Sequence, residues 1–203
     1  MQNSHDPQED SGNQTAGFPG KARQEAESEY GPLRDIGLCI VHASSNCHDA
    51  VKSWIQAENE TKRQQTEFQL FNEFLFFFTH MVTRRIFGYV GDALMGKLVN
   101  YLGAAIPSVA VESYFSNWPI DFKNNMLNEF VELLNEAERQ YTALDATGEI
   151  MPVLMLLTRH VLEMLGVNEA DETKASEVLK VVAGELDGMD MDRLILNLKQ
   201  LEN

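Results

Sequence analysis

The sequence TKRQQTEFQLFNEFLFFFTHMVTRRIFGY, residues 61–89, is the most strongly patterned part of the chain. One set of apolar side chains recurs every three or four residues, as on one face of an α-helix: Phe68, Phe71, Leu75, Phe78, Val82, Ile86 and Tyr89. A second stripe lies beside the first and consists of Leu70, Phe74, Phe77 and Met81. A helix that is apolar over so much of its surface needs partners on several sides. We therefore expect it to be the central helix of an all-α domain.

Helical patterns continue on both sides of this stretch. Before it, apolar residues predict a helix over residues 32–57, with Pro32 in the first turn. Thr61 and Gln64 have the spacing of a capping box at the start of the central helix. After it, further helices are expected to begin near residues 92, 119, 152, 168–171 and 190–192, and Gly103 and Pro107 should end or kink the first of these. The expected fold is a single compact helical domain of about six or seven helices.

The first 31 residues differ in composition from the rest of the chain. They are rich in Gln, Asn, Ser, Gly and acidic residues and show no apolar periodicity, which is typical of segments that bury too little surface to become ordered. We expect residues 1–31 to be a flexible acidic tail and residues 32–203 to be the helical domain. A length of 203 residues suits one such domain.

The charge balance restricts the partners of this protein. The chain carries 16 basic and 31 acidic residues, for a formal net charge of −15. Such a surface repels phosphates, so no nucleic-acid partner is expected. It favours basic partners and keeps a protein soluble.

Cysteine usage and apolar runs indicate the compartment. The spacing of Cys39 and Cys47 does not match a disulfide framework, a metal site or a redox motif. Two reduced cysteines of this kind suit a reducing cytoplasm. The first ten residues, MQNSHDPQED, do not resemble a signal peptide. The most apolar run, residues 150–165, is interrupted by Arg159, His160 and Glu163. We therefore expect a cytoplasmic protein with no membrane span.

Ionisable side chains on the central helix form the main candidate site. The candidate ligand-binding residues are Glu73, Phe77, His80, Arg84, His160 and Glu163. The first four share one side of the central helix, and the last two are one turn apart on the helix that begins near residue 152. Burying such groups in apolar surroundings is costly unless they are paired. We expect the two sets to meet, either as structural pairs or around a ligand pocket.

The spacing of these residues argues against a metal. Glu73 and His80 are two turns apart, about 10 Å along the helix axis, so they cannot share one ion as a helical pair. A second set has the residue types of a zinc site: Cys39, His42, Cys47 and His48. One helix would point them to different faces. Cys39 would act as a nucleophile only if its thiolate were stabilised. We assign no metal, no cofactor and no catalytic residue.

Aromatic and methionine side chains at helical spacing form either a packed core or the wall of an apolar cavity. The residues that would build such a wall are Phe76, Phe77, Phe78, Met81, Met151 and Met155. An exposed part of the same surface would instead bind a partner helix or a second copy of the chain.

The leading functional hypothesis is a non-enzymatic, soluble helical module that acts through contacts with a protein partner, or with itself as a homodimer. The alternative is a binder of a small apolar ligand or a metal in a helical-bundle pocket lined by Glu73, His80 and His160. An enzyme is the third hypothesis, because the sequence contains no recognisable acid–base or nucleophile constellation. An exposed apolar patch would favour a partner, and an enclosed cavity would favour a ligand.

Overall fold

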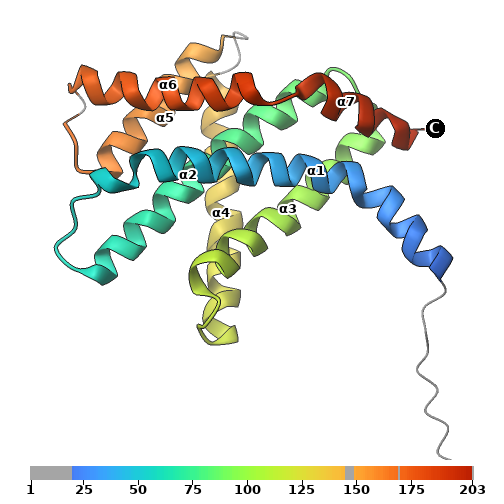
Figure 1. Ribbon diagram of the computed structural model, residues 1–203, viewed down its shortest axis with the longest axis horizontal. Helices are drawn as coiled ribbons and strands as arrows, with labels where there is room; N and C mark the ends of the chain where they lie inside the picture. Colours follow the sequence, from blue (N-terminus) through green and yellow to red (C-terminus); the bar gives the residue numbers. More distant parts are fainter. Residues whose placement is uncertain (1–19, 145–148, 169, 203) are drawn as a thin grey trace, which may run out of the picture.

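The regular structure of the described chain is helical throughout. The computed structural model describes residues 20–144, 149–168 and 170–202, with side chains from residue 31 onward. These ranges contain seven α-helices and no strand (Figure 1). The helices are α1 (Gly20–Val51), α2 (Glu60–Phe87), α3 (Asp92–Phe115), α4 (Ile120–Leu144), α5 (Ile150–Met164), α6 (Glu172–Gly188) and α7 (Met191–Lys199), with 3₁₀ turns at Lys52–Trp54 and Gln200–Glu202. The prediction of an all-α domain of six or seven helices is confirmed.

The central helix that residues 61–89 predict is α2. Every residue from Leu70 to His80 is buried, and α1, α3, α4, α5 and α7 all contact the helix. Phe74, Phe77 and Phe78 are closed to solvent. Full burial of one such side chain stabilises a fold by about 1.5–3 kcal/mol. The core is therefore built around α2, and each of these five helices covers a part of it.

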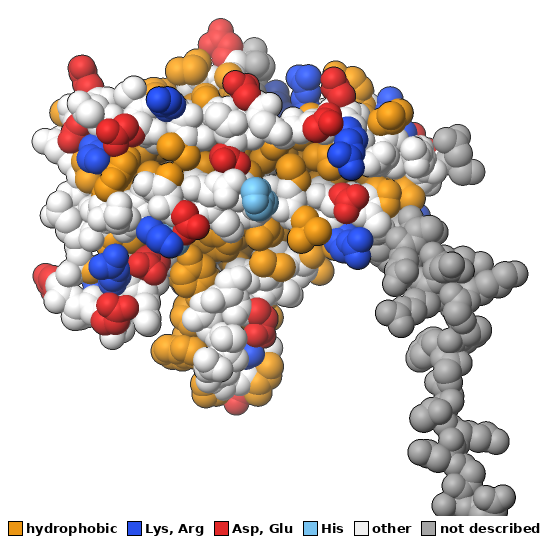
Figure 2. Space-filling model, in the orientation of Figure 1, with side chains coloured by type: hydrophobic (Ala, Val, Ile, Leu, Met, Phe, Trp, Pro, Cys, Tyr) orange, Lys and Arg blue, Asp and Glu red, His pale blue; other side chains and the backbone are white. Residues whose placement is uncertain are grey.

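The end of α3 and the start of α4 project away from the other helices (Figure 1). The two helices contact one another along this projection. Figure 2 shows hydrophobic side chains gathered on the flank of the projection. Apolar residues there are exposed to a substantial degree, including Trp118 and Ile120 at 47% and 66%. This projection forms one side of the groove described below.

The first described helix is longer than the sequence predicts. α1 begins at Gly20, so Pro32 lies inside the helix and not in its first turn. The predicted boundary between tail and domain, at residues 31 and 32, therefore falls within α1, and residues 1–19 of the predicted tail lie outside the described residues. α1 lies alongside α6 and α7 and contacts both (Figure 1).

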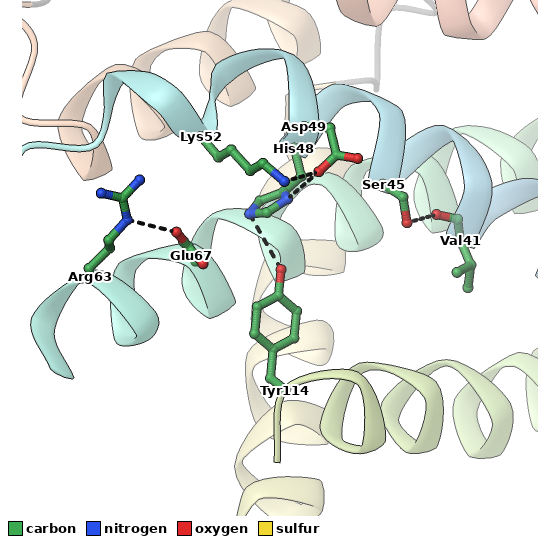
Figure 3. Close-up of polar contacts among 8 residues, drawn as sticks. All are labelled: Val41, Ser45, His48, Asp49, Lys52, Arg63, Glu67 and Tyr114. Atoms are coloured by element: carbon green, nitrogen blue, oxygen red, sulfur yellow. Dashed lines mark hydrogen bonds and ion pairs between the residues drawn. The ribbon is translucent and has the colours of Figure 1, made fainter. Parts of the chain in front are cut away.

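Two serines in the middle of α1 do not interrupt it. The Ser44 hydroxyl donates to the Ile40 carbonyl at 2.8 Å. The Ser45 hydroxyl donates to the Val41 carbonyl at 2.9 Å (Figure 3). Serine hydroxyls that bond the carbonyl four residues earlier are compatible with a continuing helix. The helix runs on to Val51 and then tightens into the 3₁₀ turn Lys52–Trp54.

The sequence predicts that Gly103 and Pro107 end or kink the third helix. The structure shows that the helix does not end at either residue. α3 continues through both to Phe115. Its buried stripe extends across the proline, with Leu102 and Ile106 before it and Ala110 after it. A proline inside a helix costs about 3 kcal/mol, and burial of this stripe offsets that cost.

α3 also has the length and composition of a membrane-spanning helix. Its most apolar window has a mean hydropathy of 1.3, and 39% of that window is buried inside the fold. The helix packs against α1, α2 and α4. A core helix satisfies the same criterion of length and hydropathy, so the expectation of no membrane span stays a prediction.

α5 is enclosed on one side only, although the sequence at its start is apolar nearly all round. Met151 and Met155 are each 53% exposed, whereas Val153, Leu157 and Val161 form its buried face. Because the stretch is apolar nearly all round, its sequence does not indicate which side of the helix faces the core. The helix ends with Gly166 in the left-handed conformation at φ +67. The Gly166 and Val167 amides donate back to the last turn, as in a Schellman motif.

The start of α2 differs from the predicted capping box. Asn59 is the N-cap residue, and its Oδ1 accepts a hydrogen bond from the Lys62 amide at 2.8 Å. Thr61, the predicted cap, lies exposed in the first turn. The prediction is wrong because both residues carry an oxygen able to cap, and the chain leaves the helical conformation at Asn59.

This difference is testable by mutation. We expect Asn59→Ala to lower the free energy of unfolding by about 1 kcal/mol, because the Lys62 amide loses its acceptor. Thr61→Ala is the matched control, and its effect should stay within about 0.5 kcal/mol. Urea denaturation followed by circular dichroism measures both. A larger loss of unfolding free energy in Thr61→Ala than in Asn59→Ala would show that Thr61, as in the predicted capping box, caps the helix.

Candidate functional site

A groove of about 890 Å³ lies between α2 and α4, with additional residues from the end of α3 and from α5. Its α2 wall includes Thr61, Gln64, Phe68, Asn72, Glu73 and Phe76. Its α4 wall includes Phe122, Met126, Glu129, Leu133, Glu136 and Tyr141. Apart from adjacent Asn72 and Glu73, the residues of each series recur every three to five positions, so each wall is a single face of one helix. On α2 this face is about 22 Å long at 1.5 Å per residue.

The lining combines apolar surface with negative charge. Its large apolar members are Phe68, Phe76, Phe115, Trp118, Phe122, Met126, Leu133 and Met164. Its carboxylates are Glu73, Glu129, Glu136 and Glu163, and no lysine or arginine is among the lining residues. The α2–α4 groove is therefore an aromatic and methionine-containing surface bordered by acidic groups. Such a surface suits an occupant that is apolar on one side and positively charged on the other.

The floor of the groove holds a buried carboxylate. Glu73 is 7% exposed, and its Oε1 accepts hydrogen bonds from the Tyr141 hydroxyl and from Nδ1 of His160, both at 2.8 Å. No described residue donates to Oε2. Neighbouring Asn72 is 2% exposed, and its Oδ1 has no hydrogen-bond partner among the described residues. The groove wall thus carries, at adjacent positions, an amide whose buried oxygen is unpaired and a carboxylate that the described residues bond through one oxygen only.

The protonation of this cluster follows from its contacts. The hydrogen bond to Glu73 raises the pKa of His160, and it outweighs partial burial, which acts in the opposite direction. Burial, followed by the charge of Glu73, raises the pKa of Tyr141 well above its usual range. Tyr141 therefore stays protonated and donates to the carboxylate at physiological pH. His160 gains positive charge from its pairing with Glu73.

The structure divides the predicted polar row into two parts. Glu73, His160 and Glu163 line the groove, and the expected meeting of His160 with the row is present. His80 is buried elsewhere, with Nδ1 at 3.0 Å from both carboxylate oxygens of Glu138. Tyr141 separates the parts, since it bonds Glu73 on one side and its ring centroid lies 5.4 Å from that of His80 on the other.

The remaining two predicted residues lie outside the groove. Phe77 belongs to the closed core, where its ring packs edge-on against Tyr141 at 6.1 Å between centroids. Arg84 is exposed beyond the lining residues. The helices therefore do not form a pocket lined jointly by Glu73, His80 and His160, because His80 does not line the groove.

Most of the predicted aromatic wall also lies elsewhere. Of Phe76, Phe77, Phe78, Met81, Met151 and Met155, only Phe76 lines the groove. Phe77 and Phe78 are core residues, and the two α5 methionines face outward. The side chains that do form the wall were missed as site residues: Phe68, Phe115, Trp118, Phe122 and Met126. Their helical spacing was visible in the sequence, but it is also the spacing of core residues.

The cysteines do not form a nucleophilic site. Cys39 is half-buried and Cys47 is buried, and both thiols are free. Burial raises the pKa of each thiol, and Glu185 adds to the effect. Both shifts favour the unreactive thiol form over the thiolate. Among the described residues, no group of three or more His, Cys, Asp or Glu side chains is arranged to hold a metal ion.

His48 holds the end of α3 beside α1 and α2 (Figure 3). Its Nε2 lies 3.3 Å from the Tyr114 hydroxyl, and its Nδ1 lies 3.5 Å from Asp49. Burial lowers the pKa of His48 and so favours the neutral ring, whose Nε2 accepts from Tyr114 when Nδ1 carries the proton. Tyr114 also packs against Phe68 and Phe71, with ring centroids 5.5 Å apart. These contacts fix one side of the α2–α4 groove.

Comparison of the chain with protein-family models, with curated proteins and with solved structures gives no match. Function is therefore inferred from the groove itself, namely from its two helical walls, its acidic border and the carboxylate on its floor.

The Glu73–His160 contact predicts a pH dependence of stability. Because the folded pKa of His160 lies above the ordinary value of about 6.5, the pair contributes fully below that pH and loses its contribution as pH rises through the folded pKa. We expect the urea midpoint to fall between about pH 6 and about pH 9 by more in the native protein than in His160→Asn. The asparagine amide keeps a donor near the position of Nδ1 but does not titrate.

The matched control for this test is His42→Asn, because His42 is exposed and makes no contact with Glu73. The urea midpoint of His42→Asn should fall between about pH 6 and about pH 9 by as much as that of the native protein. If the urea midpoint of His160→Asn falls by as much as that of the native protein, the Glu73–His160 pair does not cause the pH dependence of stability.

Proposed function

We propose that this protein is an interaction module that binds a positively charged amphipathic helix of a protein partner in the α2–α4 groove. The observation that carries the proposal is the pair of walls, each a single helical face, with apolar side chains between them and carboxylates along the border. An amphipathic helix that lays its apolar face into such a groove is a recurrent mode of peptide recognition.

The dimensions of the groove support a helical occupant. The α2 wall is about 22 Å long, which corresponds to about four turns of helix at 5.4 Å per turn. Aromatic and methionine side chains are well suited to such contacts, because aromatics bury large areas and methionine adapts its shape to the occupant. The exposed residues Trp118 and Leu133, at 47% and 45%, would gain burial from this partner.

Charge supports a basic partner over a second copy of the chain. The lining has four carboxylates and no lysine or arginine, and the whole chain carries a net charge of −15. A homodimer would bring two such acidic molecules together. Residues 1–19 of the chain itself contain Asp6, Glu9 and Asp10 and no lysine or arginine, so they do not complement the groove.

A small apolar ligand is the second candidate, because a volume of about 890 Å³ lies within the range of ligand pockets. Catalysis has less support. Apart from Tyr141, the only hydroxyl among the lining residues is that of Thr61, and no serine or cysteine lines the groove. Thr61 is 12 positions from Glu73 on the same helix, about 18 Å along its axis. Among the described lining residues, the His160–Glu73 pair therefore has no serine, threonine or cysteine beside it.

The test uses a fluorescein-labelled peptide of about 18 leucine and lysine residues, with all leucines on one helical face. We expect fluorescence anisotropy to show binding to the native protein, and the affinity to fall as salt screens the carboxylates. Leu133→Arg should weaken binding by about tenfold or more, because it places bulk and positive charge in the groove.

Val131→Arg is the matched control. Val131 lies on the same helix at a similar exposure, 40% against 45% for Leu133, but it does not line the groove. The control should bind within about twofold of the native protein. Equal weakening by both variants would place the peptide elsewhere. A protein that binds no peptide but takes up a small apolar dye would contradict the proposal and favour the second candidate.

A further inference from the structure

Glu73 is an unusual residue for the floor of an apolar groove. Its side chain is 10% exposed, and burying a carboxylate is costly unless hydrogen bonds and opposite charge compensate it. Both donors that the structure supplies, Tyr141 and His160, bond the same oxygen, Oε1. Oε2 receives no hydrogen bond from a described residue. The compensation of the buried carboxylate is therefore one-sided.

Asn72 is an independent sign of a missing partner. Its side chain lines the same groove, and its Oδ1 is buried without a hydrogen-bond partner in the described chain. Buried polar groups in native proteins are nearly always bonded. Glu73 Oε2, by contrast, is not among the buried unpaired atoms of the described chain, so it is the oxygen of this pair that a donor from an occupant of the groove can reach.

The surrounding charges favour a cationic donor. Glu129, Glu136 and Glu163 line the groove with Glu73, and Arg159, on the same helix as His160, does not line it. Because Oε1 is already occupied by two donors, the carboxylate does not offer the two free oxygens that an arginine fork needs. A lysine ammonium is a compact cation that bonds a single oxygen without needing a second one beside it.

From this geometry we infer that Glu73 is the specificity-determining residue of the groove, and that it accepts a hydrogen bond through Oε2 from a lysine on the apolar face of the bound helix. The inference rests on the proposed function and adds what the partner must carry. Glu73 thus selects partners that carry a lysine at the matching position. The exposed carboxylates at the border attract any positively charged helix.

This arrangement couples binding to a proton. The charged groups that face Glu73 are His160, with Arg159 and Glu163 near it on α5, and Tyr141, with Glu138 near it on α4. An ammonium at Oε2 disfavours the protonated form of His160, so binding of the lysine lowers the pKa of His160 and reduces the proton occupancy of its ring.

The experiment compares two versions of the leucine–lysine peptide that differ at the centre of the apolar face. One has lysine there, and the other has norleucine, which has the same four-carbon chain without the ammonium. We expect the native protein to bind the lysine version about tenfold more tightly, as for one charge-assisted hydrogen bond. Glu73→Gln should remove or reverse this preference.

Glu136→Gln is the matched control. It removes a groove carboxylate that is exposed at the border, so it should weaken both peptides alike and leave their affinity ratio within about twofold of the native value. If the two peptides bind with equal affinity in both variants, the overall negative charge of the groove, and not Glu73, selects the lysine.

A measurement on the native protein covers the case in which Glu73→Gln does not fold. Calorimetric titration at about pH 7 in two buffers of different ionisation enthalpy reports the protons released on binding. The lysine peptide should release more than the norleucine peptide, and equal release would overturn the inference.

The outcomes separate this inference from the proposed function. If the native protein binds the norleucine peptide as tightly as the lysine peptide, the groove binds helices but Glu73 does not select them, and the inference is overturned. If it binds neither peptide, the proposed function fails and the inference fails with it.

Discussion

The need to cover α2 on every side determines how this protein is built. The helix is buried without interruption from Leu70 to His80, and no single neighbour can cover a cylinder of that kind. Five other helices share the task. Towards the start of α2 the cover thins, because the end of α3 and the start of α4 project outward (Figure 1). The groove is the part of α2 that its own chain leaves partly open.

Tyr141 links this core to the groove. Its ring is buried against Phe77 and lies close to His80, and its hydroxyl reaches the carboxylate of Glu73. The same side chain thus completes the core on one side and forms part of the groove floor on the other. Where α4 crosses α2, polar residues that the sequence places in one row are divided between a buried contact, that of His80 with Glu138, and a candidate binding surface.

Several features were predictable because they depend on local periodicity or on local turn chemistry. The central helix follows from apolar spacing between residues 61 and 89, and the end of α5 follows from a glycine that adopts a positive φ at Gly166. Local rules failed where tertiary contacts decided the result. α3 passes through Pro107 because its buried stripe continues beyond the proline. The exposure of Met151 and Met155 reflects which side of α5 meets its neighbours.

The sequence by itself determined the fold class, the identity of the central helix and the approach of His160 to the polar row on α2. Those properties depend on spacing along one helix, or on the cost of leaving an ionisable group unpaired in an apolar environment. Only the tertiary structure decided that Phe68 and Phe122 face a groove while Phe77 and Phe78 face the core. All four have the same residue type and helical spacing, and the angle at which helices cross determines which faces are covered.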